Sequence, residues 1–152
     1  MSEVKRIEYS AAGQEPLLPL FEMGKYLHKS TIEKNIQEFI KIRMSQINGC
    51  AYCLDMHWKD ARALGETEQR LYGLGAWKES PYYSERERAA LLWAEAVNSC
   101  HVCDKVYQEA SKHFSDKELV ALTMAVNNIN CWNRLNIAFS KERVGTYEVG
   151  QY

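Results

Sequence analysis

One long apolar segment, residues 116–139, restricts the possible folds more than any other part of the sequence. Ser115 and Glu118 form a capping-box pattern that is typical of a helix start. The apolar side chains that follow fall on nearly all sides of a helix: Leu119, Val120, Leu122, Met124, Val126, Ile129, Trp132, Leu135, Ile137 and Phe139. Because such a helix has no polar face for water, we expect it at the centre of a bundle or shared with a partner subunit. A homo-oligomer is therefore predicted.

Two more capping-box patterns, Ser30 with Glu33 and Ser84 with Glu87, precede segments with helical periodicity. No tight turn joins two runs of alternating apolar residues, so no β-hairpin is expected. The sequence predicts an all-α fold, a compact helical bundle over residues 16–140, with an N-terminal arm (1–15) and a C-terminal tail (141–152). Helices are predicted at 16–28, 31–47, 50–64, 67–76, 84–98, 103–113 and 116–139.

The composition of the chain restricts the partners and the cellular compartment that we expect for it. The net charge is −1, from 19 basic and 20 acidic residues, which favours neither nucleic acid nor an anionic membrane surface as partner. No uncharged apolar run is long enough for a membrane span, and the first residues lack the apolar region of a signal peptide. We therefore expect a cytoplasmic protein. Five cysteines, an odd number, argue against a structural disulfide framework and favour reactive or metal-binding thiols.

A CxxC pair with a histidine one turn later is the strongest chemical signal. Gly49 suits a break between two helices, which places Cys50 near the start of the second helix. There the helix dipole and the free N–H groups lower the pKa of a thiol. Cys53 and His57 follow at helical spacing, so the three side chains share an arc of about 60°. This arrangement suits nucleophilic thiol chemistry, and Glu38 on the preceding helix is a candidate to orient the histidine.

Other roles for the cysteines stay open. A lone CxxC is also found as half of a metal site or as a buried pair. A second CxxC, Cys100 to Cys103, raises the possibility of a four-thiolate zinc site, although the 46 residues between Cys53 and Cys100 exceed the usual spacing. The second pair is otherwise interpreted as incidental thiols or an accessory redox pair. Cys131, within the apolar helix, is expected to be a small buried residue.

Polar residues also interrupt the apolar helix. Asn130, Asn133 and Arg134 surround Trp132 in the middle of the segment. We expect a buried arginine to need acceptors nearby. The group is interpreted as a polar contact between helices or subunits, with a substrate pocket as the alternative.

The run from Ile42 to His57, which includes Ile47-Asn48-Gly49-Cys50-Ala51-Tyr52-Cys53-Leu54-Asp55-Met56-His57, closely resembles the AhpD-like alkyl hydroperoxidase core of the carboxymuconolactone decarboxylase superfamily. Ile129-Asn130-Cys131-Trp132-Asn133-Arg134 resembles a second family segment. His101-Val102-Cys103-Asp104 resembles a His-Val-Pro-Asp turn of the family. The resemblance spans residues 30–140.

The resemblance implies an all-helical subunit of a homotrimer or homohexamer that reduces peroxides. It implies that Cys53 attacks the peroxide, that Cys50 resolves the oxidised sulfur, and that Glu38 and His57 form a proton relay. AhpD itself has a histidine where this chain has Tyr52, and a phenol is a poor base near neutral pH. The decarboxylase members lack the CxxC, so decarboxylation is not expected.

Taken together, the residues and the resemblance predict a thiol-dependent peroxidase with a redox-active Cys50–Cys53 disulfide. Its partners are expected to be a hydroperoxide substrate and a dithiol or thioredoxin-like electron donor. No nucleotide or flavin cofactor is expected, because no motif for one occurs, and no metal is expected, because the separation of the two CxxC pairs does not suit a zinc site. The alternatives are a general disulfide reductase that does not use peroxide and a structural zinc or interaction protein.

Overall fold

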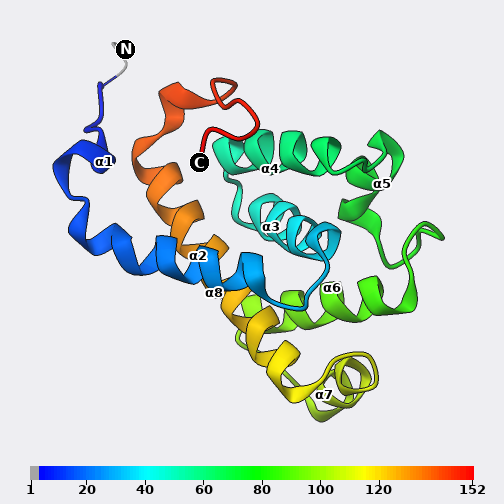
Figure 1. Cartoon of the computed structure of the whole chain (residues 1–152). Helices are drawn as coiled ribbons and strands as arrows, with labels where there is room; N and C mark the ends of the chain where they lie inside the picture. Colours follow the sequence, from blue (N-terminus) through cyan, green and yellow to red (C-terminus); the bar gives the residue numbers. More distant parts are fainter. Residues whose placement is uncertain (1–3) are drawn as a thin grey trace.

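A computed structural model describes residues 4–152, and Figure 1 shows its helices. They are α1 (Tyr9–Ala12), α2 (Leu18–Lys29), α3 (Lys34–Asn48), α4 (Ala51–Ala63), α5 (Glu68–Tyr72), α6 (Glu85–Asn98), α7 (Asp104–Ser111) and α8 (Asp116–Phe139). Three short 3₁₀ turns complete them: η1 (Glu15–Leu17), η2 (Gly73–Ala76) and η3 (Lys141–Arg143). No strand occurs in the described residues, which confirms the predicted all-α fold.

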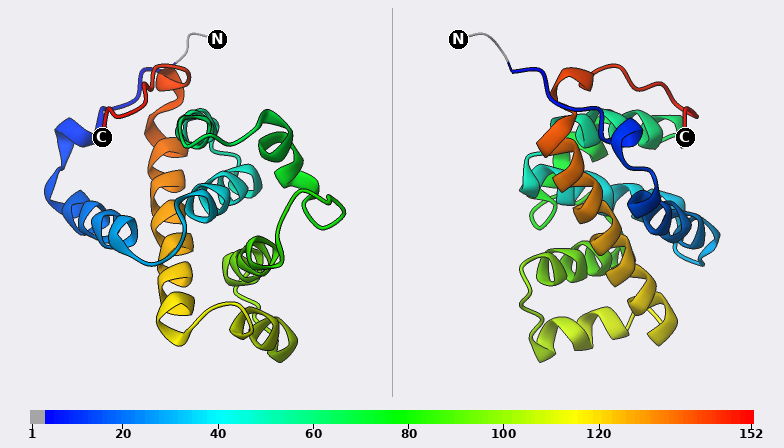
Figure 2. Two further views of the ribbon diagram at one scale, coloured as in Figure 1. Left: turned by 45° about the vertical axis from the view of Figure 1, so that its right-hand side comes forward. Right: turned by 90° about the vertical axis from the view of Figure 1, so that its left-hand side faces the viewer.

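The long helix α8 lies at the centre of the bundle. It packs against α2, α3, α4, α6 and α7, and Figure 2 shows it running through the molecule with α2 on one side and α3 and α4 on the other. Its buried side chains include Leu122, Val126 and Ile129. One narrow stripe stays exposed, at Val120, Asn127, Cys131, Arg134 and Ala138, with exposed Ile137 beside it. The expected central position is therefore confirmed, while the predicted sharing with a partner subunit stays a prediction.

Two of the three predicted capping boxes are present. Ser84 with Glu87 begins α6, and Ser115 with Glu118 begins α8. The prediction for Ser30 was wrong, because Ser30 ends α2 and its hydroxyl donates to the Leu27 carbonyl at 2.7 Å. Glu33 is itself the N-cap of α3, which begins at Lys34, so Ser30 lies outside that helix and no box forms there.

The single helix predicted over residues 67–76 is divided into α5 and η2. Gly73 and Gly75 disfavour a continued α-helix. Leu71, Leu74 and Trp77 are all buried at intervals of three residues, which is the period of a 3₁₀ helix. The change of helix type therefore lets three apolar side chains face the same part of the core.

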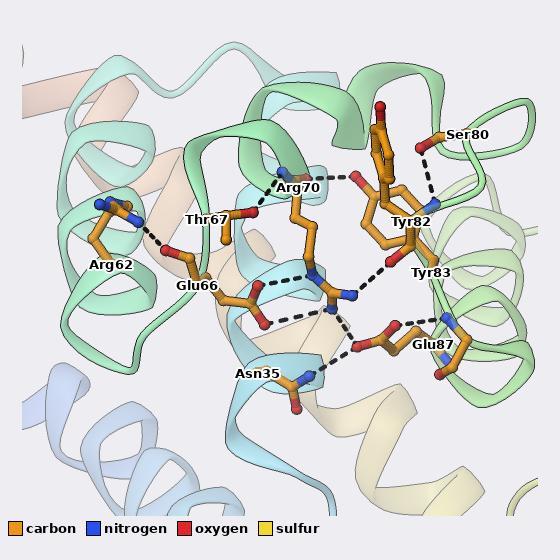
Figure 3. A network of polar contacts seen from close by, with 10 residues as sticks. Asn35, Arg62, Glu66, Thr67, Arg70, Ser80, Tyr82, Tyr83 and Glu87 are labelled. Carbon is orange, nitrogen blue, oxygen red and sulfur yellow. Dashed lines mark hydrogen bonds and ion pairs between the residues drawn. The ribbon is translucent and has the colours of Figure 1, made fainter.

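A polar network supports the side of the molecule away from the cysteines (Figure 3). The guanidinium of Arg70 contacts the carboxylates of Glu66 at 2.8 Å and Glu87 at 2.5 Å. Asn35 of α3 donates to the same Glu87 at 2.8 Å. The guanidinium also lies 5.0 Å from the centre of the Phe39 ring. The network links α5, α6 and α3, and thereby steadies the helix that carries Glu38.

A second polar contact joins α3 to α8, as the sequence predicted. The Asn48 amide donates to Asn130 at 2.6 Å and to Asn133 at 2.9 Å, and Asn133 donates to the Ser45 hydroxyl at 3.0 Å. Asn133 is fully buried. Arg134 was expected to be buried but is exposed, because it lies on the outer stripe of α8, where it donates to the Asn130 carbonyl at 2.9 Å.

The two chain ends pack on the bundle next to each other. The first three residues of the predicted arm lie outside the described residues. Within the rest, Tyr9 packs against Phe139, with ring centres 6.0 Å apart, and Glu8 forms an ion pair with Arg143 at 3.6 Å. In the predicted tail, Tyr147 is only 4% exposed. Both ends therefore contribute to the surface over the C-terminal half of α8.

The Asn133 contact generates a stability prediction. Asn133→Ala removes one partner from a buried hydrogen bond to Ser45 and from a half-buried one to Asn48. We expect the free energy of unfolding, measured by urea denaturation, to fall by about 1–3 kcal/mol. Arg134→Ala, one residue along on the exposed face, should change it by less than about 0.5 kcal/mol. Equal effects of the two substitutions would contradict the assignment.

Candidate active site

The turn at Gly49 creates the start of α4. Gly49 has a positive φ of 75°, a left-handed conformation that suits glycine, and it caps α3. The next residue, Cys50, is the N-cap of α4, and its sulfur accepts from the Cys53 N–H at 3.3 Å. The position predicted from the sequence is confirmed. Cys50 lies where backbone N–H groups and the helix dipole favour a thiolate.

Cys50 and Cys53 form a disulfide, with Cα atoms 5.3 Å apart. Both residues are buried, with exposed fractions of 1% and 2%. The side-chain amide of Asn136, on α8, donates to the Cys53 sulfur at 3.7 Å. The predicted pairing is therefore present, and a side chain that the sequence did not single out contacts one of its two sulfurs.

His57 and Glu38, the two residues of the predicted proton relay, contact each other in the structure. His57 Nδ1 is 2.9 Å from Glu38 Oε2, and both residues are buried. The contact joins α4 to α3 across 19 residues of sequence. With Nδ1 engaged by the carboxylate, Nε2 is the ring nitrogen left for proton exchange with a bound molecule. The structure thus brings the residues together, while their catalytic roles remain predictions.

The charge state of Glu38 follows from its neighbours. Burial raises the pKa of a carboxyl, but the charge and hydrogen bond of His57 together with Lys41 outweigh it and lower the pKa of Glu38 from 4.5 to about 2. The Lys41 ammonium lies 2.6 Å from the second carboxylate oxygen. Glu38 is therefore ionised at neutral pH and can stabilise a positive charge on His57.

Asp60 and Tyr147 extend this group beyond the predicted residues. Asp60 lies one turn after His57, with Oδ2 3.9 Å from His57 Nδ1. The Tyr147 hydroxyl donates to Asp60 Oδ1 at 2.7 Å. Burial, with the charge of Glu38, raises the pKa of Asp60. The i+3 spacing from His57 could have indicated Asp60, whereas no pattern in the sequence connects Tyr147 to the site.

One group of three potential metal ligands occurs within residues 4–152, formed by Glu38, His57 and Asp60. Their ligand atoms lie within 4.8 Å of one another. A metal bound by all three would have to replace the direct contact between His57 Nδ1 and Glu38 Oε2. The group contains no cysteine, so the four-cysteine zinc site considered from the sequence is not formed.

A cavity of about 980 Å³ opens beside the disulfide. Its wall is formed by α2, α3, α4, α8 and residues from both chain ends. Cys53, His57 and Glu38 line the cavity, and Cys50 is not among its lining residues. A molecule in the cavity can therefore approach Cys53 rather than Cys50.

Tyr52 lies in the same wall. The Arg143 guanidinium donates to its hydroxyl at 3.4 Å and lies 5.1 Å from its ring centre. Burial, with Tyr152, raises the pKa of Tyr52, so the phenol stays neutral at physiological pH. It can donate or accept a hydrogen bond but cannot serve as the base that histidine provides in AhpD.

The other three cysteines lie elsewhere and are exposed. Cys100 and Cys103 lie in the connection between α6 and α7, where Cys103 is the N-cap of α7. The expectation that Cys131 is buried was wrong. It lies on the outer stripe of α8, two residues from buried Ile129 and Asn133, and this spacing places it on the opposite face of the helix.

Residues 18–96, from α2 to α6, match the family model of the carboxymuconolactone decarboxylase family. This segment contains Glu38, Cys50, Cys53 and His57. The chain belongs to this family. Its AhpD-like character agrees with the helical fold and the disulfide described above.

Known relatives support the membership. The uncharacterized protein YdfG of Bacillus subtilis is 43% identical over 88% of this chain and 93% of its own length. A structure of ATU0492 from Agrobacterium tumefaciens, a protein of unknown function linked by name to the antioxidant defence protein AhpD, is 38% identical. It superposes with a TM-score of 0.85, over 91% of this chain and 97% of that chain.

Two more distant structures share the fold. The AhpD core of a peroxidase-related protein from Ralstonia eutropha is 19% identical, with a TM-score of 0.76 over 87% of this chain and 72% of that chain. The debrominase Bmp8, solved with 2,3,4-tribromopyrrole, is 18% identical, with a TM-score of 0.73 over 92% of this chain and 90% of that chain.

No helix within residues 4–152 is long and apolar enough for a membrane span.

Thiol accessibility tests the cysteine assignment. In the native disulfide form, we expect three thiols per chain to react with a thiol reagent at once, because Cys100, Cys103 and Cys131 are exposed. Reduction followed by denaturation should raise the number to five. Five reactive thiols in the native oxidised protein would contradict the disulfide.

The lowered pKa of Glu38 generates a pH prediction. The stability contributed by ionised Glu38 is fully present above about pH 4.5 and is lost as the pH falls towards 2. Glu38→Gln should therefore lower the free energy of unfolding by about 2 kcal/mol at pH 7. At pH 2.5 the two proteins should differ much less, as measured by urea denaturation at both pH values. A difference that does not change with pH would contradict the ionised Glu38–His57 contact.

Proposed function

We propose that this protein is a thiol-dependent peroxidase that reduces organic hydroperoxides through Cys50 and Cys53. The observation that carries the proposal is the position of Cys53. It lines a cavity large enough for an organic substrate, forms a disulfide with Cys50, and precedes the buried His57–Glu38 pair by one helical turn.

The first step uses the reduced protein. Neutral His57 takes the proton of the Cys53 thiol, and the ionised Glu38 beside it stabilises the positive charge that this transfer creates. The Cys53 thiolate attacks the outer oxygen of the hydroperoxide and the O–O bond breaks. The alkoxide that leaves takes the proton from His57 and becomes an alcohol. Cys53 is then a sulfenic acid, and the Asn136 amide beside its sulfur can donate to the oxidised group.

The second step forms the disulfide. The Cys50 thiolate, stabilised by the Cys53 N–H and the start of α4, attacks the Cys53 sulfur. The hydroxide of the sulfenic acid leaves as water after taking the proton that Cys50 gave up. In sum, one hydroperoxide and two thiols become one alcohol, one water and one disulfide. An external dithiol or a thioredoxin-like protein then supplies two electrons and two protons to restore the thiols.

The cavity supports the order of attack in this scheme. The helix start favours Cys50 as the more acidic thiol, and the family resemblance assigns the attack to Cys53. Because Cys53 rather than Cys50 faces the cavity, the peroxide meets Cys53 first. The acidity of Cys50 then serves the second step, where a thiolate must attack a neighbouring sulfur.

We also propose a homotrimer or homohexamer, which is what the family resemblance implies. The mass of the purified protein by light scattering tests it. A monomer at micromolar concentration would exclude both assemblies.

Thiol counting tests the function. We expect one equivalent of cumene hydroperoxide to remove two thiols rapidly from the reduced protein. Cys53→Ser should abolish the reaction, and Cys50→Ser should stop it at a sulfenic acid that dimedone traps. His57→Ala should slow the reaction about 100-fold, because a general acid–base group is lost. His101→Ala, at an exposed histidine outside the cavity, is the matched control.

Two outcomes would count against a peroxidase. Unchanged peroxide reduction in Cys50→Ser, Cys53→Ser and His57→Ala would exclude this site. Slow reaction with peroxide combined with rapid exchange with reduced thioredoxin would indicate a general disulfide reductase instead.

A further inference from the structure

The cavity carries a different charge from the rest of the molecule. The chain as a whole has a net charge of −1. The charged residues of the cavity wall are Lys25, Lys29, Lys34, Lys41, Arg143, Glu38 and Asp60. Lys25 forms an ion pair with Glu22, Arg143 with Glu8 and Lys41 with Glu38. Among the described residues, Lys29 and Lys34 are therefore the basic residues of the wall that form no ion pair, and their positive charges favour an anionic ligand.

Two of these lysines lie together at the end of the cavity where α2 meets α3. Lys29 is the last residue of α2 and is exposed, and Lys34 is the first residue of α3. The Lys34 ammonium donates to the backbone carbonyl of His28 rather than to a carboxylate. Burial, with the positive charge of Lys41, lowers the pKa of Lys34, which agrees with a local excess of positive charge.

The separation between Lys34 and Cys53 follows from how α3 and α4 pack. The contacts from Cys50 to Ser45 and from His57 to Glu38 show that α3 and α4 run antiparallel. Along this pair of helices, Lys34 lies eight residues beyond the level of Cys53, which corresponds to about 12 Å at 1.5 Å per residue. This separation corresponds to the length of an extended carbon chain. A ligand that contacts Lys34 and the Cys53 sulfur at the same time must therefore contain such a chain.

Apolar side chains occupy the wall between these two ends. Phe21 and Leu27 come from α2, Met56 from α4, and Ile129 and Trp132 from α8. The rings of Phe21 and Trp132 lie 5.0 Å apart. An alkyl chain placed here would be shielded from water on the sides formed by α2 and α8, which is favourable in proportion to the apolar area buried.

We propose that the substrate of this site is the hydroperoxide of a long-chain carboxylic acid, with its carboxylate at Lys29 and Lys34, its chain along the apolar wall and its peroxide at Cys53. This inference rests on the proposed peroxidase function for the reacting group. The recognition of the chain and the carboxylate depends only on the cavity. A volume of about 980 Å³ is in the range of pockets that enclose a ligand of this size.

Binding of an unreactive analogue tests the recognition separately from the chemistry. Dodecanoate and methyl dodecanoate differ only in the charge of the head group, and neither can oxidise a thiol. We expect the oxidised wild-type protein to bind dodecanoate about tenfold more tightly than its methyl ester, as measured by calorimetry at low ionic strength. The preference should shrink at 0.5 M salt, because salt screens the lysine charges.

Two variants test the position of the carboxylate. Lys29→Glu, at an exposed position, and Lys34→Gln, which keeps a donor for the His28 carbonyl, should each reduce the preference for the acid at least threefold. Lys117→Gln, at an exposed lysine on α8 outside the cavity, is the control and should keep the full preference. Far-UV circular dichroism and thermal unfolding confirm that each variant is folded.

The outcomes separate this inference from the proposed function. Equal binding of acid and ester, or no binding of either, overturns the substrate class even if cumene hydroperoxide is reduced. If Lys117→Gln also lost the preference for the acid over the ester, the assignment of that preference to Lys29 and Lys34 would be overturned. Preferential binding of the acid without any peroxide reduction would support the recognition of the carboxylate and contradict the peroxidase. Preferential binding together with faster reduction of a fatty-acid hydroperoxide than of its methyl ester supports both.

Discussion

The reversal of the chain at Gly49 is the constraint on which the site depends. A left-handed residue ends α3, and α4 then returns along α3 in the opposite direction. This single turn places Cys50 at a helix start and sets His57 opposite Glu38. A Cβ atom at position 49 would meet no neighbour within 4 Å, so the requirement for glycine there comes from the backbone conformation and not from space.

Much of this could be predicted because it is local. Cys50, Cys53 and His57 lie within eight residues, so helical spacing alone places them on one face. Glu38 was named because the histidine needs an acid to orient it, and the family resemblance pointed to the same residue. The capping boxes of α6 and α8 were equally local. The box at Ser30 failed because the chain is not helical between Ser30 and Glu33, so that Ser30 ends α2 and α3 begins only after Glu33.

The cavity could not be predicted, because its wall comes from six parts of the chain. The C-terminal residues looked like a tail, yet Tyr147 is buried against Asp60 and Tyr152 stacks on Tyr147 with ring centres 6.1 Å apart. Cys131 and Arg134 were misplaced for a related reason. When a helix is apolar on almost every side, its sequence does not show which face is exposed to water, because the helices that pack against it decide this. In α8, no other helix of the described residues packs against the exposed stripe.

The contribution of the last residues to the cavity has a consequence for how the protein is made. Ninety-three residues of sequence lie between Cys53 and Tyr147. At translation rates of about 5–20 residues per second, the cysteine pair leaves the ribosome about 5–20 seconds before Tyr147, whose hydroxyl donates to Asp60. A newly made chain therefore has Cys50 and Cys53 outside the ribosome before the last part of the cavity wall exists. During that interval the C-terminal residues do not yet enclose the two cysteines.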